Sequence, residues 1–364
     1  MKGAMLSSAG QSEACRREGR LGRIDVFIPC YNYGRFLSQC VNSVLGQDGV
    51  DVRVLVIDDA SPDNTAEVAA ALAREDPRVT VIRHSTNKGH INTYNEGIEW
   101  ASADYMLLLS ADDYLLPGAL SRAADLMDVH PDVGFTFGNV IELSDSGNET
   151  PIKSIIKTNN DSDKRILGGH EFIELSGADN LVATCSAVVR TELQKHLGGY
   201  RCELPHTGDM EMWLRFAAHA SVGFVSAYQG VYRCHRANMS TAYYLISDGR
   251  LVYTKNGRLA DLQQRKSALD CFSEHCHDVL PRCEHVCRGL YRKLSKLAVG
   301  RASAAFNEGE MEESRQLSEF ALAVCPEIKS SSAWVKLTCK RWMGARTWRA
   351  VRPAAAAIRA MQRN

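Results

Sequence analysis

The fold of this chain is indicated most clearly by the stretch Tyr105-Met106-Leu107-Leu108-Leu109-Ser110-Ala111-Asp112-Asp113-Tyr114. An apolar run of strand length ends there in two adjacent carboxylates, and Pro117-Gly118 breaks the chain soon afterwards. In an open α/β sheet, ligands bind beyond the carboxyl ends of buried strands. Paired carboxylates at such a place suit a divalent cation that also binds phosphate. The alternative is a solvated Asp-Asp turn that caps the next helix.

Strands and helices are predicted to alternate in this part of the chain. The predicted strands are Ile24–Pro29, Val52–Ile57, Val79–Arg83 and Tyr105–Ser110. The predicted helices are Phe36–Leu45, Thr65–Ala73 and Ile91–Ala101. Continuous apolar strands that alternate with helices imply a parallel sheet covered on both faces. The predicted fold class is therefore α/β.

The alternation becomes less regular beyond residue 130. Further strands are predicted at Val133–Gly138, Thr184–Arg190, Val222–Val225 and Gly230–Arg233. The polar segment Glu142–Lys164 is predicted to be a loop. Helices are predicted at Met210–Ala218 and before Gly198-Gly199, and the chain from about Ile246 onward is expected to be helical. Within it, Leu294–Ala323 resembles a helical hairpin that turns at Asn307-Glu308-Gly309.

Composition excludes some classes of protein but says less about function than the motifs do. The 364 residues suffice for one large domain or two smaller ones, and the net charge is zero. A nucleic-acid binder is not expected from that balance. The N-terminus, residues 1–22, has no apolar core of a signal peptide and is predicted to be disordered. The 12 cysteines are scattered, which favours reduced thiols and a cytoplasmic location.

The C-terminal tail, residues 328–364, differs in charge from the rest of the chain. It contains nine Lys and Arg, no Asp or Glu, and three tryptophans: Trp334, Trp342 and Trp348. A basic segment with aromatic side chains suggests peripheral contact with an anionic membrane surface, at the inner face of the membrane. The alternative is a surface helix with a solvated basic face.

Polar side chains follow three of the predicted strands. Tyr31 and Asn32 follow the first, where an aromatic ring and an amide can stack on a base and bond its edge. Asp59 follows the second, where a carboxylate can accept a hydrogen bond from a base or a ribose. Asp112-Asp113 follows the fourth. A nucleotide diphosphate with a divalent cation fits all three positions.

Four motifs in order resemble the family-2 glycosyltransferases of the GT-A fold. They are Val26-Phe27-Ile28-Pro29-Cys30-Tyr31-Asn32, Val56-Ile57-Asp58-Asp59-Ala60-Ser61-Pro62-Asp63, Asn87-Lys88-Gly89 with Asn95-Glu96-Gly97, and Leu109-Ser110-Ala111-Asp112-Asp113. The resemblance covers residues 24 to about 240. It implies a mostly parallel central sheet flanked by helices. Together with the helical pattern and the basic tail described above, the predicted domains are 23–240 for the transferase, 241–327 for the helical C-terminal region and 328–364 for the tail.

The resemblance also implies site residues. The implied nucleotide-sugar-binding residues are Pro29, Tyr31, Asn32, Asp59, Asn87, Lys88, Gly89, Ser110, Ala111 and Asp112. Asp112, Asp113 and His235 are the implied ligands of the cofactor, a divalent cation (Mn²⁺ or Mg²⁺). His235 lies in Tyr232-Arg233-Cys234-His235-Arg236, which resembles a late motif near the diphosphate. The family's first acid of D-x-D is Ser110 here, so Asp112 supplies the carboxylate, with Asp113 beside it.

The catalytic base implied by the resemblance is Asp209, in His206-Thr207-Gly208-Asp209-Met210-Glu211. A base of this kind deprotonates the acceptor hydroxyl as it attacks the anomeric carbon with inversion. The alternative is that Asp209 only caps the following helix, and Glu211 is a rival base. The usual acidic predecessor of the base is replaced by Gly208.

A second constellation lies outside these motifs. It comprises Cys271, His275, Cys276, His277, Cys283, His285 and Cys287. Seven such side chains in seventeen residues could bind zinc, but they lack paired C-x-x-C spacing. Cys283 and Cys287 also suit a buried helix face, where free cysteine packs as a small apolar residue.

The leading hypothesis is a glycosyltransferase that moves a sugar from a nucleotide-diphosphate donor to a glycan or lipid-linked acceptor in surface polysaccharide or lipopolysaccharide synthesis. Ser110, Gly208 and the long helical region leave open a second hypothesis, a non-catalytic nucleotide-sugar- or glycan-binding scaffold. A dinucleotide-dependent dehydrogenase is disfavoured because the first strand–helix turn, from Pro29 to Gly34, lacks G-x-G-x-x-G.

Overall fold

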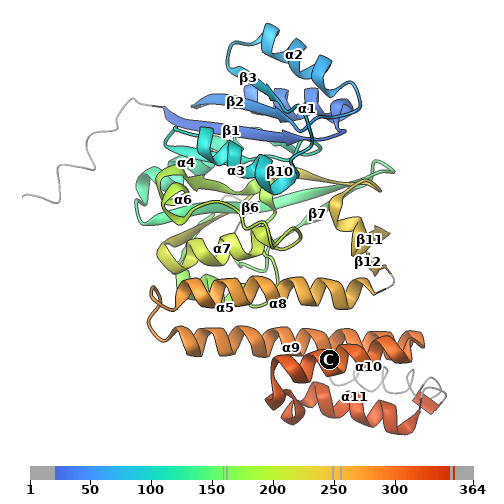
Figure 1. The fold of residues 1–364 in the computed structure, drawn as a ribbon. Helices are drawn as coiled ribbons and strands as arrows, with labels where there is room; N and C mark the ends of the chain where they lie inside the picture. Colours follow the sequence, from blue (N-terminus) through green and yellow to red (C-terminus); the bar gives the residue numbers. More distant parts are fainter. Residues whose placement is uncertain are drawn as a thin grey trace, which may run out of the picture. The chain divides into compact units, whose positions relative to one another are not determined.

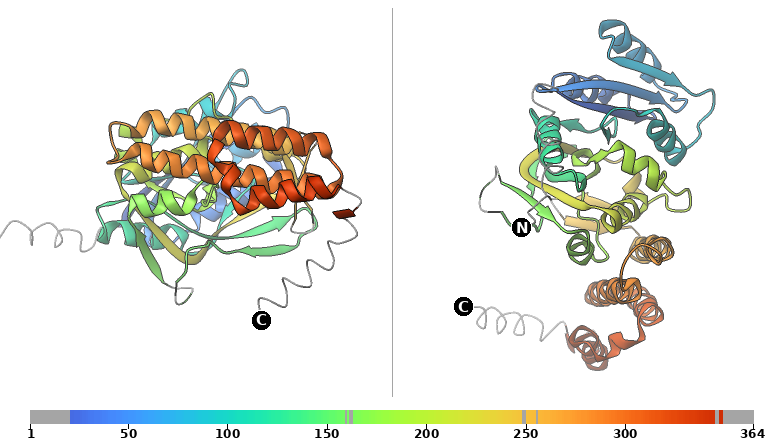
Figure 2. Two further views of the ribbon diagram at one scale, coloured as in Figure 1. Left: turned by 90° about the horizontal axis from the view of Figure 1, so that it is seen from below. Right: turned by 90° about the vertical axis from the view of Figure 1, so that its left-hand side faces the viewer.

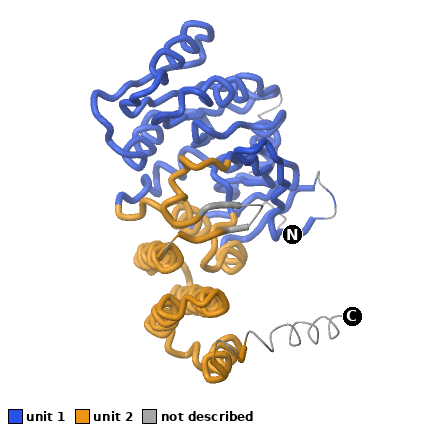
Figure 3. The backbone as a smooth tube through the Cα atoms, turned by 90° about the vertical axis from the view of Figure 1, so that its right-hand side faces the viewer, with its two compact units in different colours: residues 1–169, 182–202, 219–233 blue, residues 170–181, 203–218, 234–364 orange. Residues whose placement is uncertain are grey.

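The computed structural model describes residues 21–158, 160, 163–247, 250–254, 256–344 and 347–348. The predicted disordered N-terminus lies outside these residues except for its last two, and strand β1 already begins at Gly22. The last part of the basic tail also lies outside. Figure 3 shows two compact units. Unit 1 runs to Gly169 and includes Val182–Cys202 and His219–Arg233; unit 2 comprises His170–Leu181, Glu203–Ala218 and the chain from Cys234 onward.

The first half of the sheet in unit 1 is parallel, as predicted. Its strands are β1 (Gly22–Cys30), β2 (Val50–Asp58), β3 (Val79–Arg83) and β4 (Tyr105–Leu108), in the order β3-β2-β1-β4. Figure 1 shows β3, β2 and β1 side by side. In the register, Cys30 lies beside Asp58 and Phe27 beside Leu108. The carboxyl ends of these strands therefore lie along one edge of the sheet, which is where the sequence motifs lie.

Antiparallel strands continue the same sheet beyond β4. They are β9 (Val188–Arg190), β6 (Val133–Ser144), β10 (Ser221–Cys234) and β5 (Tyr114–Leu115), with β7 (Glu149–Ile152) on β6 and β8 (Lys164–Leu167) on β10. The prediction of a loop over Glu142–Lys164 was wrong in part, because β6 extends into it and pairs with β7. The two short strands predicted within Val222–Arg233 are one strand, and Thr184–Ser186 is a 3₁₀ turn rather than strand.

Helices cover both faces of the parallel half. One face carries α1 (Gly34–Leu45), α2 (Thr65–Glu75) and α4 (Ala119–Val129), whose apolar residues join Ile24, Val26 and Ile28 of β1 in one buried cluster. The other carries α3 (His90–Trp100). There Phe27 lies so close to Gly97 that a Cβ on Gly97 would come within 2.2 Å of the ring. Successive side chains of β1 thus point to opposite faces of the sheet, where they pack against the two layers of helices.

Unit 2 is mainly helical (Figure 2). Its helices are α5 (Gly169–Ser176), α7 (Gly208–His219), α8 (Gly257–Cys276), α9 (Cys283–Glu308), α10 (Met311–Val324) and α11 (Ser332–Met343). It also contains a hairpin of β11 (Tyr244–Ser247) and β12 (Arg250–Tyr253). The short helix α6 (Thr191–Leu197) belongs to unit 1. The hairpin corrects the prediction of helix from Ile246. The predicted helical pair is confirmed as α9 and α10, and Gly309 ends α9 with a φ of +96°.

Candidate functional site

The turns that follow β1 and β2 are held against one another. The backbone N–H of Asn32 donates to Ser61 Oγ over 3.0 Å, and that of Asp59 donates to the Cys30 carbonyl over 2.9 Å. Asn32 and Ala60 both adopt positive φ, 62° and 59°. Left-handed backbone at a residue other than glycine is uncommon and concentrates at functional sites. Beside these turns, Tyr31 is 48% exposed, so its ring is accessible for stacking on a base.

Asp59 is the centre of a hydrogen-bond network that includes the motif Asn87-Lys88-Gly89. Its Oδ1 is 2.7 Å from His84 Nδ1 and accepts from the Lys88 N–H at 2.7 Å, while Oδ2 accepts from the Gly89 N–H at 2.9 Å. Burial raises the pKa of Asp59, but the hydrogen bonds from His84, Lys88 and Gly89 outweigh it and hold the pKa below its ordinary value. The predicted residues Asp59, Lys88 and Gly89 therefore converge.

His84 was missed by the reading of the sequence. The ring is buried and bridges two acids, because its Nε2 lies 2.9 Å from Glu96 Oε2. Glu96 also accepts from Lys88 Nζ at 3.1 Å. A histidine directly after β3, whose last residue Arg83 pairs with Asp58 at the end of β2, is the signal that could have identified it.

The remaining members of the middle motif have structural partners. The Asn95 side chain accepts from the Tyr200 N–H at 2.7 Å and donates to the Tyr200 carbonyl at 3.0 Å. A Cβ on Gly199 would lie 2.3 Å from Asn95 Oδ1, so glycine is needed for this clamp. Asn87 Oδ1 accepts from the Gly89 N–H at 3.0 Å and closes the turn that starts α3.

The acidic turn after β4 is tied to β1 and closed by a hydrogen bond of its own. The Leu109 N–H donates to the Phe27 carbonyl at 3.1 Å, and the Asp113 N–H donates to the Ser110 carbonyl at 3.0 Å. Asp112 and Asp113 are only 5% and 4% exposed. Neither acid caps α4, which starts at Ala119 after Gly118 and has no acid in its first turn. The helix-cap alternative is therefore wrong.

Arg233 secures this turn from β10. Its backbone N–H donates to Asp113 Oδ1 at 2.9 Å, and its Nε donates to the Asp112 carbonyl at 2.8 Å. The guanidinium also donates to Gln39 Oε1 at 2.8 Å and lies 4.7 Å from the centre of the Phe36 ring. The orientation of the Arg233 guanidinium beside the two acids is thus fixed by its hydrogen bonds to Asp112 and Gln39 and by the face of the Phe36 ring.

The two carboxyl groups fit a hard divalent cation. Burial and the adjacent charge of Asp112 raise the pKa of Asp113 well above its ordinary value, although Arg233 opposes the rise. Two buried carboxylates that repel each other offer the oxygen donors that Mg²⁺ and Mn²⁺ prefer, and a cation would relieve the repulsion. Ser110 has a hydroxyl where a third acid would stand, so the donor set is limited to this pair and the neighbouring turn.

Asp209 lies in the first turn of α7, within unit 2. Its Oδ1 accepts from the Met210 N–H at 2.8 Å, and its Oδ2 accepts from Asn180 Nδ2 at 2.6 Å. Burial raises the pKa of Asp209, and the hydrogen bonds from Met210 and Asn180 act against that rise. Because α7 already begins at Gly208, Asp209 is inside the helix and is not its cap.

Glu211, the rival base, is fully buried. Its two carboxylate oxygens accept from Arg215 Nε at 3.0 Å and Nη2 at 2.7 Å, one helical turn away. A carboxylate held in this way has an internal structural role, and Asp209 is the better placed acid of the two.

The segment before Asp209 is anchored to α8. His206 Nε2 lies 2.9 Å from Asp261 Oδ1, and Thr207 Oγ1 donates to the Gln264 carbonyl at 2.9 Å. Asp261 is fully buried, and it also pairs with Arg265 and Arg301. Although burial raises the pKa of Asp261, these partners lower it well below the ordinary range. The start of α7 is therefore held by a charged network of the helical region.

His235 follows β10, at the start of the C-terminal part of unit 2. Its Nδ1 accepts from the Ala237 N–H at 3.2 Å, and this hydrogen bond places the ring proton on Nε2. In this tautomer the ring is suited to donate to an anionic oxygen. Ligation of a metal by His235 stays a prediction, and it would require Nε2 to lose this proton, because Nδ1 is already an acceptor.

The predicted residues thus fall into two groups. Unit 1 holds the residues predicted to bind the nucleotide sugar or the metal at this edge of the sheet: Pro29, Tyr31, Asn32, Asp59, Asn87, Lys88, Gly89, Ser110, Ala111, Asp112 and Asp113. Pro29 lies one residue before the end of β1, beside Ile57. Unit 2 carries Asp209 and His235.

A mostly parallel first half of an α/β sheet, with polar turns after β1 and β2 and an acidic turn after β4, defines the class of nucleotide-sugar transferase folds. Residues 25–183 match the model of Glycosyl transferase family 2, and this part of the chain belongs to that family. The predicted α/β fold with a helical C-terminal region is confirmed.

Curated relatives cover only parts of this chain. An uncharacterized protein of Mycobacterium tuberculosis is 28% identical over 210 residues, which are 56% of this chain and 64% of that protein. Chondroitin synthase of Pasteurella multocida is 36% identical over 101 residues, 28% of this chain and 10% of the synthase. The chain therefore spans less than two thirds of the length of these relatives.

A solved structure extends the likeness of fold. Residues 1–349 of S. aureus TarS, in complex with UDP-GlcNAc, align with a TM-score of 0.59 at 16% sequence identity. The alignment covers 82% of this chain and 79% of that one. At this identity the likeness concerns the fold.

Proposed function

We propose that this protein transfers a sugar from a nucleotide-diphosphate donor to a hydroxyl group of a glycan or lipid-linked acceptor, with inversion at the anomeric carbon. The observation that carries the proposal is the edge of the sheet where Tyr31-Asn32, Asp59 and Asp112-Asp113 follow β1, β2 and β4. Membership of a glycosyltransferase family and the polysaccharide synthase among the relatives support it.

The donor nucleotide would lie along this edge. The exposed Tyr31 ring would stack on the base, and the Asp59 carboxylate, oriented by His84 and the 88–89 backbone, would accept a hydrogen bond from it. The relation to a fold solved with UDP-GlcNAc supports a nucleotide sugar as donor.

The diphosphate would lie at the acidic turn. Asp112 and Asp113 would hold a divalent cation, Mn²⁺ or Mg²⁺, and the cation would neutralise charge on the departing diphosphate. The fixed Arg233 guanidinium and the Nε2–H of His235 are suited to phosphate oxygens.

Asp209 would act as the base. Its carboxylate would take the proton of the acceptor hydroxyl while that oxygen forms a bond to the anomeric carbon. The bond from this carbon to the diphosphate oxygen breaks at the same time, and the diphosphate leaves with the electron pair. Attack opposite the leaving group inverts the configuration.

The tail is proposed to contact a membrane surface, where lipid-linked acceptors are found. On α11, Trp342 is 89% exposed and Val335 is 51% exposed, whereas Leu337 is buried. Among the residues that the structure describes, no helix combines the length and hydrophobicity needed to cross a bilayer. Contact would therefore be made by exposed aromatic and basic side chains at the interface.

The test is a panel of nucleotide sugars assayed for transfer and for donor hydrolysis, with and without Mn²⁺. Wild-type protein is expected to release the nucleoside diphosphate from one donor, and Asp112→Asn to lose this activity. Asp125→Asn, a change of an exposed carboxylate on α4, is the matched control. Binding of a donor without turnover in wild type, equal in Asp112→Asn, would instead indicate the non-catalytic scaffold.

A further inference from the structure

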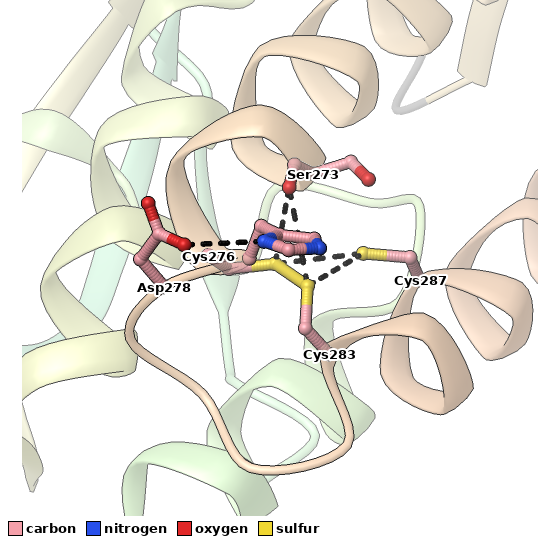
Figure 4. The surroundings of a disulfide bond; sticks show 6 residues. Ser273, Cys276, Asp278, Cys283 and Cys287 are labelled. Atoms are coloured by element: carbon pink, nitrogen blue, oxygen red, sulfur yellow. Dashed lines mark hydrogen bonds and ion pairs between the residues drawn. A yellow bond between two sulfur atoms is a disulfide. The ribbon is translucent and has the colours of Figure 1, made fainter.

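We propose that Cys276, Cys283 and Cys287, in their reduced state, form a thiolate site for a divalent metal ion of the zinc class. The site lies in unit 2, where the turn between α8 and α9 brings the end of one helix to the start of the next (Figure 4). It is independent of the glycosyl-transfer proposal.

The geometry selects three of the seven candidate residues in the Cys/His segment. One ligand atom of each of these cysteines lies within 4.8 Å of the other two, and all three residues are buried. Across the part of the chain that the structure describes, this is the one group of three or more His, Cys, Asp or Glu side chains that converges so closely. The sequence alone could not separate these three from their neighbours, because their spacing fits no paired motif.

The distances from Cys287 match those of a metal–thiolate centre. Its Sγ is 3.6 Å from Cys276 Sγ and 3.7 Å from Cys283 Sγ. Tetrahedral zinc with bonds of about 2.3 Å to sulfur requires sulfurs about 3.8 Å apart. The carbonyl oxygen of Ser273 is 3.6 Å from Cys276 Sγ, so this oxygen or water would fill the fourth position.

The helices provide an electrostatic setting for thiolates. Cys283 is the first residue of α9, a helix of 26 residues, and Cys287 is one turn further on the same face. The N-terminus of a long helix stabilises negative charge, which favours the ionised form of a thiol. Soft thiolate ligands select zinc-class ions over Mg²⁺ or Ca²⁺.

The structure itself shows the oxidised form of the same group. Cys276 and Cys283 are joined in a disulfide, and Cys287 is a free thiol. A phosphine reductant returns the disulfide to two thiols, as the phosphine gains the oxygen of a water molecule and the two sulfurs gain its protons. Three thiols then each lose a proton as three metal–sulfur bonds form. The metal and the disulfide are therefore mutually exclusive ways to clasp the α8–α9 turn.

The experiment uses the full chain, freed of metal, reduced with a phosphine and titrated with Co²⁺. We expect one equivalent to bind with an intense thiolate-to-cobalt charge-transfer absorption, and Zn²⁺ to abolish that absorption by displacement. The protein before reduction is expected to show none of it, because two of the three ligands are then bonded to each other.

Two variants and one control test the assignment. Cys287→Ser and Cys276→Ser should each weaken Co²⁺ binding by more than about tenfold. Cys325→Ser, which changes a buried cysteine outside the group, should bind as wild type does. Cys287→Ser leaves the Cys276–Cys283 pair able to form its disulfide, so it keeps the test valid if Cys276→Ser does not fold. Reduced wild type without the absorption, or Cys287→Ser with an undiminished one, would overturn the proposal.

Discussion

The backbone N–H of Arg233 donates a hydrogen bond of 2.9 Å to Oδ1 of Asp113, across 120 residues of sequence. Because the donor is a backbone group, the bond fixes the acidic turn to β10 whatever side chain residue 233 carries, proline excepted. The Arg233 side chain adds a second bond, to the Asp112 carbonyl. The position of the acids is thus secured by the sheet itself.

Because Asp113 is held through one oxygen, its charge can be removed without loss of this hydrogen bond. Asp113→Asn keeps an oxygen that can accept from Arg233 but removes a buried charge next to Asp112. We expect the variant to be no less stable than wild type without metal. Addition of Mn²⁺ should raise the melting temperature of wild type and leave that of Asp113→Asn nearly unchanged. Equal shifts in both proteins, measured by thermal denaturation, would remove Asp113 as a ligand.

The hydrogen bond from Asn180 to Asp209 predicts a change in pH dependence. A base must be ionised, and burial raises the pKa of Asp209, so kcat/KM should fall as the pH drops through this raised pKa. Asn180 stabilises the ionised form. Asn180→Ala should therefore move the acid limb to higher pH, and Asp209→Asn should reduce kcat by about 10²- to 10⁴-fold.

Asn42→Ala, on the exposed side of α1, is the control for this experiment. It should leave the pH profile in place. An acid limb that stays where it is in Asn180→Ala, together with lower activity at every pH, would show that Asn180 supports only the fold.

Asp59 predicts how the stability of unit 1 depends on pH. The pKa of Asp59 in the folded protein lies below 3.8, its ordinary value. The ionised carboxylate therefore stabilises the folded state fully above about pH 3.8, and this contribution is lost as the pH falls through the folded pKa. Asp59→Asn should lower the free energy of unfolding at neutral pH by about 1–3 kcal/mol, and the difference should shrink in acid. Denaturant unfolding from about pH 7 to about pH 3 measures it. A difference that does not change with pH would contradict the assignment.

The contact between Gly97 and Phe27 predicts the effect of a single methyl group. A Cβ at residue 97 would lie 2.2 Å from Phe27 Cδ2, so Gly97→Ala should destabilise the protein by about 1–3 kcal/mol. Gly300→Ala is the matched control, because this glycine lies in α9 with nothing within 4 Å of an added Cβ. That change should stabilise by up to about 1 kcal/mol, since alanine is the better helix former. Chemical denaturation of both variants tests the sign of each effect.

The exposure of Trp342 predicts how the tail would contact a membrane. Lys340 Nζ bonds Ser303 Oγ, and Arg341 bonds the hydroxyls of Ser314 and Ser318, so two cations of α11 face inward rather than toward a surface. The exposed Trp342 side chain would then provide much of the contact, so Trp342→Ala should weaken binding of the full chain to anionic vesicles by up to about tenfold. Sedimentation with neutral and anionic vesicles measures it, and equal binding to both kinds would exclude an electrostatic contribution.

The parallel half of the fold could be predicted from the sequence because its strands are apolar throughout and end in turn residues. β3 was predicted with its observed bounds, and β1, β2 and β4 to within two residues. The later strands were harder because they are antiparallel and partly polar. β7, with residues such as Glu149 and Thr150, is exposed along its length, so its composition resembles that of a loop.

The acids of the candidate site were predicted from motifs, whereas the partners that hold them could be found only in the fold. His84 and Asn180 do not belong to any short motif, yet they orient Asp59 and Asp209 from distant parts of the chain. Likewise, the convergence of Cys276 with Cys287 depends on how α8 meets α9. Contacts of this kind are set by the path of the backbone, and among these residues only His84, directly after β3, has a position in the sequence that could have indicated it.

The anchoring of His206 and Thr207 to α8 has a consequence for the inheritance of this gene. A chain shortened after residue 240 would keep every motif of the family domain but lose Asp261 and the Gln264 carbonyl, which hold the segment that leads to Asp209. Recombination that exchanged the part after residue 240 for that of a relative would break the same partnership. The two parts are therefore expected to change together in evolution rather than to be exchanged separately.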